Sequence, residues 1–99
     1  MFCHFLAKFF DLSPQDEKEV QSLKVTLYSN IAACYIKLEN WDNVIRYTTD
    51  ALAIEENAKC YFRRSQAWEA RKEWEKALSD SQKAIEVKFV CFFLLKFYF

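Results

Sequence analysis

Lys59 and Arg63 are the residues whose types and spacing best suit binding chemistry. On a helix, a spacing of four puts both side chains on one face, where like charges repel by about 0.2–0.5 kcal/mol. An anion between them would remove that cost. Arg offers a planar fork of donors and Lys a compact point charge, so the pair suits a carboxylate ligand. The alternative interpretation is an ordinary solvated helix face.

Catalytic and metal chemistry find little support elsewhere in the chain. His4 stands beside Cys3, but no third group follows at a ligand spacing. A lone His in a terminal segment also cannot complete a Ser-His-Asp triad. Carboxylate pairs such as Glu55-Glu56 are typical of helix ends and exposed surfaces. We therefore expect no enzymatic activity, no metal and no cofactor.

The composition fits one small domain of 99 residues. Gly is absent and Pro14 is the single proline, which argues against Gly-rich phosphate loops and tight β-hairpin turns. With 14 basic and 14 acidic residues, the chain has no net field to gather nucleic acid. Four cysteines never form a CxxC pair, and we expect them to be free thiols in the reducing cytoplasm. They are Cys3, Cys34, Cys60 and Cys91.

The elements that would position Lys59 and Arg63 come from an internal repeat with an offset of 33 residues. Aromatic, small and aliphatic residues recur at matching places in residues 25–57 and 58–87. The matched pairs are Tyr28/Tyr61, Ala32/Ser65, Tyr35/Trp68, Trp41/Trp74, Val44/Ala77, Ile45/Leu78, Ala51/Ala84 and Leu52/Ile85. A repeat of this length with helical periodicity predicts stacked helical hairpins. We expect an all-α fold with helices at about 15–38 (or a broken pair there), 42–55, 58–71 and 75–87.

Polar residues mark the expected ends of these helices. Ser13 is a predicted N-cap, with Pro14 at the first helical position and Glu17 as the acidic partner of a capping box. Asn40 is placed to cap the second helix, and residues 72–73 form the short turn of the second copy.

Both ends of the chain are dense in Phe and differ from the repeats. Residues 1–13 and 88–99 are apolar segments that flank a repeat domain expected at 14–87. Neither reaches the roughly 20 apolar residues that a membrane-spanning helix needs, and the opening lacks the basic start of a signal peptide. Because residues 88–99 have no polar stripe, we expect the Phe-rich ends to promote self-association.

A resemblance to a known family rests on two segments, YSNIAACYIKLENWDNVIRYTTDALAIEENA (28–58) and KCYFRRSQAWEARKEWEKALSDSQKAIEV (59–87). They resemble consecutive tetratricopeptide repeats. They are similar to the second and third repeats of the chaperone-binding kind, found in FKBP-type immunophilins, aryl-hydrocarbon-receptor-interacting proteins and myosin chaperones. The resemblance covers about residues 15–87 and implies a right-handed α-solenoid of two repeats with flanking helices. Val44, Thr48, Glu56 and Ser81 depart from the family's pattern.

The resemblance also implies a function. Members of this subgroup bind the free C-terminal peptide of heat-shock chaperones of the ninety- or seventy-kilodalton class, which ends Glu-Glu-Val-Asp, in a two-carboxylate clamp. The clamp positions fall here on Asn30, Lys59 and Arg63, and Lys37 and Gln66 would add rim contacts. The chain would then be a cytoplasmic, co-chaperone-like adaptor that does not bind nucleic acid.

Other functions stay open at this point. The family's clamp takes a further Lys and Asn from the preceding repeat, and residues 1–24 contain no Lys-x-x-x-Asn. The clamp would therefore be partial. The alternatives are a repeat scaffold without a clamp, a membrane-associated piece, or a truncated product without function. Arg64 also has two interpretations, because this position usually holds Leu and the Arg stem could cover the core edge.

Overall fold

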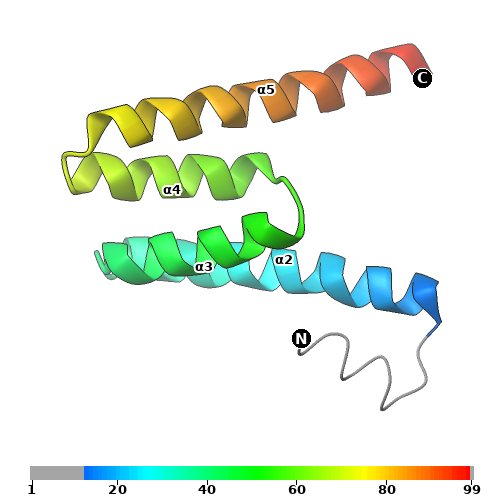
Figure 1. The fold of residues 1–99 in the computed structure, drawn as a ribbon, viewed down its shortest axis with the longest axis horizontal. Coiled ribbons are helices and arrows are strands. Elements are labelled where there is room, and N and C mark those ends of the chain that lie inside the picture. Colours follow the sequence, from blue (N-terminus) through cyan, green and yellow to red (C-terminus); the bar gives the residue numbers. More distant parts are fainter. Residues whose placement is uncertain (1–12, 99) are drawn as a thin grey trace.

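Four α-helices make up the computed structural model, which describes residues 13–98 and the side chains of residues 13–90. They are α2 (Pro14–Lys37), α3 (Trp41–Ile54), α4 (Ala58–Ala70) and α5 (Trp74–Tyr98), drawn in Figure 1. No strand occurs within the described range, so the predicted all-α fold is confirmed. The first helix is one unbroken element of 24 residues rather than a pair.

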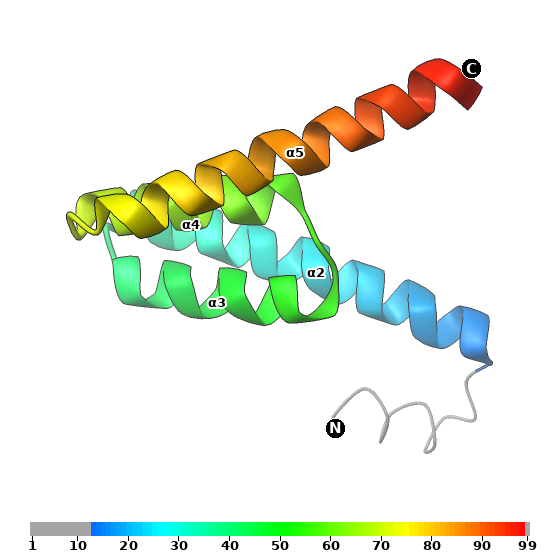
Figure 2. The same ribbon diagram turned by 45° about the horizontal axis from the view of Figure 1, so that its top comes forward.

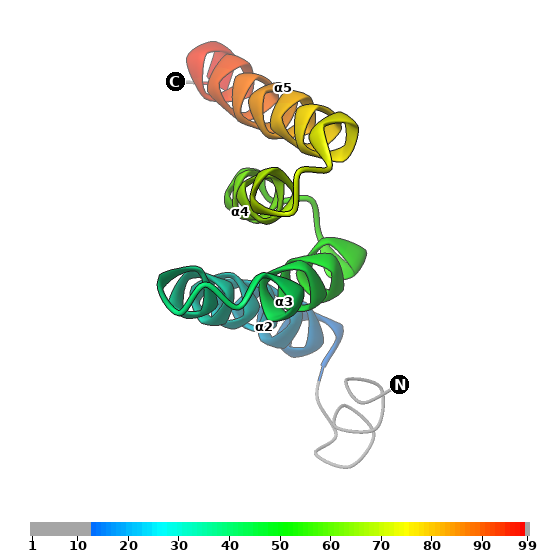
Figure 3. The same cartoon turned by 90° about the vertical axis from the view of Figure 1, so that its left-hand side faces the viewer.

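The helices form two antiparallel hairpins, α2–α3 and α4–α5, placed one on the other. Helix α3 packs against α4, and α2 also touches α4, so the second hairpin rests on both helices of the first. The end-on view in Figure 3 shows the hairpins rising as steps from α2 and α3 through α4 to α5. The right-handed superhelix implied by the resemblance stays a prediction.

Side-chain caps start the first three helices. Ser13 Oγ accepts from the Asp16 amide at 3.2 Å, and Asp16 Oδ2 accepts from the Ser13 amide at 3.4 Å. The capping box is therefore real, but its acidic partner is Asp16 and not Glu17, because a capping box needs the third residue after the cap. Asn40 caps α3 as predicted, and Asn57 caps α4 by accepting from the Cys60 amide at 3.2 Å.

Each hairpin turns through the same six-residue hydrogen-bond pattern. In the first turn, the amide of Asn40 donates to the Tyr35 carbonyl and the amide of Glu39 donates to the Ile36 carbonyl, both at 3.0 Å. In the second turn, the corresponding amides belong to Glu73 and Lys72, whose bonds are both 2.9 Å. This is a Schellman motif, which needs a left-handed residue just past the helix. Glu39 (φ 56°) and Lys72 (φ 62°) fill that place in a chain without glycine.

Replacing Glu39 or Lys72 with Gly should therefore stabilise the fold. The left-handed conformation costs an L-residue about 1–2 kcal/mol, and Gly avoids this cost. Gly is also more flexible in the unfolded chain, which offsets about 0.5–1 kcal/mol of the stabilisation. We expect each substitution to raise the free energy of unfolding by about 0.5–1 kcal/mol, as measured by urea denaturation. Gln82→Gly, at an exposed position inside α5, is the matched control and should destabilise. A loss of stability in both turn variants would contradict the strain argument.

Two apolar clusters hold the hairpins together, and each draws on α2, α3 and α4. The first centres on Val25, Ala51 and Cys60, all at most 2% exposed. The second centres on Ala32, Val44 and Ala67, all fully buried. Small residues at these positions let the helix backbones approach closely, and larger side chains fill the space around them. Those larger residues are Tyr28, Leu52 and Ile54 in the first cluster, and Tyr35, Ile36, Trp41, Ile45 and Tyr47 in the second.

Helix α5 does not end near residue 87 as predicted but continues to Tyr98. Residues 88–98 contain no Gly, Pro or N-cap-type residue that would stop a helix, so the backbone pattern simply continues. As a result α5 projects beyond the packed hairpins on the same side as the start of α2 (Figures 1 and 2). The side chains of residues 91–98 and all of residues 1–12 lie outside the description, and with them most of the Phe-rich ends.

Of the four cysteines, Cys34 and Cys60 fall among the described side chains, and both are free, as predicted. Cys34 is exposed, whereas burial raises the pKa of the Cys60 thiol above its ordinary value. Cys3, Cys91 and His4 lie outside the described side chains. Within residues 13–98, no helix combines the length and apolarity needed to cross a bilayer.

Candidate functional site

The predicted cation pair lies on α4, the first helix of the second hairpin. Asn57 caps this helix, so Lys59 falls in its first turn and Arg63 one turn further on. Lys59 is exposed and Arg63 is half-buried. The amide ends of a helix N-terminus carry partial positive charge, which adds to the charge of Lys59. The acidic residues Glu55 and Glu56 precede the cap and line the same groove as Lys59, so both signs of charge meet at this end of α4.

Arg63 is tied to the first hairpin. Its Nη1 donates to the carbonyl oxygen of Ser29 at 2.7 Å and also to the hydroxyl of the same residue. Ser29 is buried on α2, and the next residue, Asn30, is exposed. The bond thus fixes the Arg63 guanidinium at the segment of α2 that carries Asn30. Arg63 is thus bonded to the residue that precedes Asn30, and the joint use of Asn30 and Arg63 in a clamp stays a prediction.

Lys59 faces a different feature. It lines a groove of about 750 Å³ formed by the start of α4, the loop at residues 55–57 and the middle of α5. Phe62 of α4 and Ala84 and Ile85 of α5 supply apolar walls, whereas Asn30 and Arg63 do not line the groove. Of the two rim residues predicted, Lys37 is exposed near the end of α2 and Gln66 is half-buried on α4.

Neither cation of the pair is neutralised within the described part of the chain. The ion pairs there are Arg64–Asp80, Arg71–Asp42, Arg71–Glu73 and Lys76–Glu73. Arg63 donates hydrogen bonds to Ser29, which is neutral and does not offset the positive charge of the guanidinium. Lys59 and Arg63 therefore present two positive charges one helical turn apart without a carboxylate between them.

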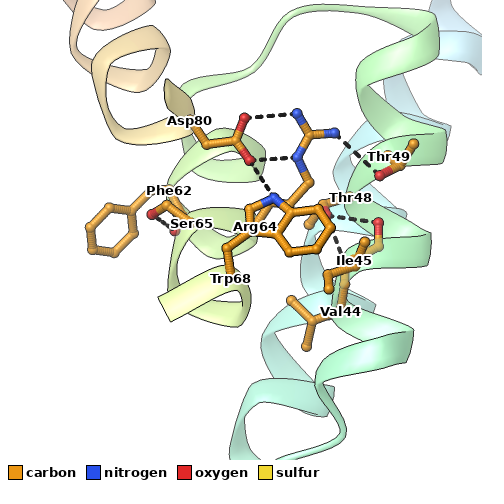
Figure 4. A network of polar contacts seen from close by, with 9 residues as sticks. All are labelled: Val44, Ile45, Thr48, Thr49, Phe62, Arg64, Ser65, Trp68 and Asp80. Carbon is orange, nitrogen blue, oxygen red and sulfur yellow. Dashed lines mark hydrogen bonds and ion pairs between the residues drawn. The ribbon is translucent and has the colours of Figure 1, made fainter. Parts of the chain in front are cut away.

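Arg64 has a role that the sequence interpretation missed. Its Nε and Nη2 donate to the two oxygens of Asp80 at 2.6 and 2.8 Å, in a fork-to-fork pair between α4 and α5. Trp68 Nε1 donates to the same carboxylate at 3.0 Å, and Arg64 Nη1 reaches Thr49 on α3 at 3.2 Å. Asp80 is only 4% exposed. Figure 4 shows Arg64 and Trp68 converging on the Asp80 carboxylate, and the separate bond from Arg64 to Thr49.

The Asp80 network is structural rather than a ligand site. The hydrogen bond from Arg64 to Asp80 raises the pKa of the guanidinium above its already high value, so the pair stays charged. Its donors and acceptors are satisfied inside the protein, and it connects α3, α4 and α5. Arg64 consequently does more than cover the core edge with its stem.

A comparison of the two repeat copies could have revealed this network. Applying the offset of 33 gives the three first-copy counterparts of the network, Ile31 for Arg64, Tyr35 for Trp68 and Tyr47 for Asp80. In the first copy, Tyr35 and Tyr47 stack with ring centroids 5.6 Å apart. The second copy thus replaces Ile31 and Tyr47, which carry no charge, with the oppositely charged Arg64 and Asp80.

These contacts define a protein of stacked helical hairpins with a pair of cations, Lys59 and Arg63, on the first helix of its second hairpin. A scan against protein-family models gives no match for the chain. FK506-binding protein 5 from Rhizopus delemar is similar to it, with 29% identity over 83 residues. The aligned part covers 83% of this chain but 22% of that protein, so the chain spans about a fifth of the relative's length.

Proposed function

We propose that the chain is a tetratricopeptide-type, co-chaperone-like adaptor that acts in the cytoplasm. Its ligand would be the acidic C-terminal peptide of a heat-shock chaperone, held by a partial clamp of Asn30, Lys59 and Arg63. The observation that carries the proposal is the pair of cations on α4 without an ion-pair partner among the described residues, one of them hydrogen-bonded to Ser29, the residue before Asn30. The similarity to FK506-binding protein 5 agrees with the resemblance to FKBP-type immunophilins.

In the proposed clamp, Arg63, Lys59 and Asn30 would each make a different kind of contact with the peptide. Ser29 holds Nη1 of Arg63, which leaves Nη2 and Nε of the same planar group for a carboxylate of the peptide. Because its orientation is fixed in advance, Arg63 loses little freedom when the peptide binds. Lys59 adds a mobile charge one turn away, and the Asn30 amide adds a neutral donor. Lys37 and Gln66 would make rim contacts.

The proposal predicts that binding depends on the free carboxylate of the ligand. A fluorescent peptide ending Glu-Glu-Val-Asp should bind the full chain on the order of tens of micromolar, since the clamp is partial. Amidation of the peptide terminus should weaken binding by about tenfold or more, and added salt should weaken it further. Fluorescence anisotropy measures both effects. Equal affinity for the acid and the amide would instead indicate a repeat scaffold without clamp function.

A further inference from the structure

The interface between the two hairpins shows how this chain covers one helix face with the next helix. On α3, the apolar residues Trp41, Ile45 and Leu52 pack against clusters to which both α2 and α4 contribute. Trp41 and Ile45 pack in the cluster that contains Ala67, and Leu52 packs in the cluster that contains Cys60. Helix α4 thereby removes an apolar stripe of α3 from water.

The same stripe recurs on α5, where no helix of the described chain covers it. The counterparts of Trp41, Ile45 and Leu52 are Trp74, Leu78 and Ile85. They are 61%, 61% and 68% exposed. Three large apolar residues at helical spacing on one face mark an interaction surface rather than scattered exposure.

The groove of about 750 Å³ lies at the same end of the stack. Its walls include Phe62 and Ala84, whose first-copy counterparts are Ser29 and Ala51. Both counterparts are buried, because Cys60 packs against Ala51 and Arg63 binds Ser29. The groove is therefore the space that α4 fills in the first hairpin.

At the opposite end of the stack, α2 exposes a surface that is complementary to the apolar stripe of α5. The α4 positions of Cys60 and Ala67 correspond on α2 to Leu27 and Cys34. Leu27 is 60% exposed and Cys34 is exposed as well. Helix α2 thus carries to the surface the face that α4 buries against α3.

We propose that α2 of one copy docks on α5 of a second copy in the way that α4 docks on α3. Such contacts join unlike surfaces, so they build a head-to-tail chain of copies rather than a closed pair. The helix lengths agree with this arrangement. Compared with α4 and α3, α2 and α5 are each eleven residues longer, at residues 14–24 and 88–98. Both extensions project on the same side of the stack, where they would run alongside each other (Figure 2).

The docked helix would approach Lys59, which lines the groove, but not Arg63, which does not line it. The first-copy counterparts of Lys59 and Arg63 are Thr26 and Asn30, and both remain exposed although α4 is docked beside them. Variants that block docking at Leu27 or Leu78 leave Lys59 and Arg63 unchanged, so self-association and peptide binding can fail independently.

A complementation experiment tests the docking. Leu27→Glu blocks the α2 face and Leu78→Glu blocks the α5 face, each at an exposed position where the fold should tolerate the change. In sedimentation velocity, the wild-type mass should rise with concentration above 11.9 kDa. Each variant alone should stay monomeric. An equimolar mixture should form a pair of twice the monomer mass and nothing larger, because one intact face of each kind remains.

The controls separate this arrangement from its alternatives. Leu38→Glu makes the same change at a residue that is 72% exposed and belongs to neither face, and it should associate like the wild type. If circular dichroism shows that a variant is unfolded, Cys34→Glu and Ile85→Glu replace the two blocking variants. A wild-type monomer at all concentrations overturns the proposal. So does association that persists in both variants, which would assign it to the Phe-rich ends, or loss in Leu78→Glu alone, which would indicate that α5 pairs with itself.

Discussion

Replacing Asp80 with Ala is expected to lower the free energy of unfolding by about 3–5 kcal/mol. Asp80 is 4% exposed and accepts hydrogen bonds from Arg64 and Trp68. Removing the carboxylate leaves the Arg64 guanidinium, whose side chain is 17% exposed, without its counter-charge, and leaves the Trp68 indole without an acceptor. Since small domains are stable by only about 5–15 kcal/mol, this loss is a large fraction of the total stability.

Urea denaturation followed by circular dichroism measures the loss. Asp50→Ala removes an exposed carboxylate from α3 and is the matched control, with an expected change within about 0.5 kcal/mol. The double variant Arg64→Ile with Asp80→Tyr copies the residues of the first repeat. It should recover most of the stability, because a packed apolar pair often replaces a buried ion pair without loss. A change of less than about 1 kcal/mol in Asp80→Ala would show that the network contributes little.

Removing either cation of the proposed clamp should weaken binding of the acidic peptide by about 1–3 kcal/mol, or roughly 5- to 150-fold in Kd. Each cation would lose a charge-assisted hydrogen bond to a carboxylate. Lys59→Ala is the cleaner variant because Lys59 is exposed. Arg63→Ala also removes the bonds to Ser29, so its fold must be checked first. Arg63→Lys keeps the charge but loses the fork, and it should be intermediate.

Arg71→Ala and Lys76→Ala remove exposed cations that pair with Asp42 and Glu73. They change the net charge by the same amount as Lys59→Ala and should leave peptide binding within about twofold of the wild type. Equal losses in these controls would mean that the peptide responds to overall charge. Unchanged binding in both Lys59→Ala and Arg63→Ala would remove the clamp from the account.

The fold follows from the sequence where repetition and capping signals agree. Helical periodicity and the offset of 33 place the first three helices within about one residue of their observed bounds. The predicted end of α5 at residue 87 was wrong, because no residue that stops a helix follows it. The change to a Phe-rich composition there does not terminate a helix. The capping box was predicted with Glu17, which lies four residues after Ser13, whereas the spacing of three selects Asp16.

The site was predictable only in part. The spacing of Lys59 and Arg63 put both on one face of α4 from the sequence alone. The bond from Arg63 to Ser29 was not predictable in the same way, because it joins residues 34 apart and depends on how α4 rests on α2. Arg64 and Asp80 were missed because a charge inside an amphipathic helix is normally assigned to its solvated face. The signal available in the sequence was that Ile31 and Tyr47 of the first copy are both replaced by charged residues in the second copy.

The most direct test of the proposed function is a titration of the ¹⁵N-labelled chain with the peptide ending Glu-Glu-Val-Asp, followed by amide chemical shifts. The proposed clamp predicts saturable shifts at Ser29 and Asn30 on α2 and at Lys59 and Arg63 on α4, and much smaller shifts at equal concentrations of the amidated peptide. Shifts confined to other surfaces, such as the Trp74–Ile85 face of α5, or the same shifts with both peptides, would contradict it.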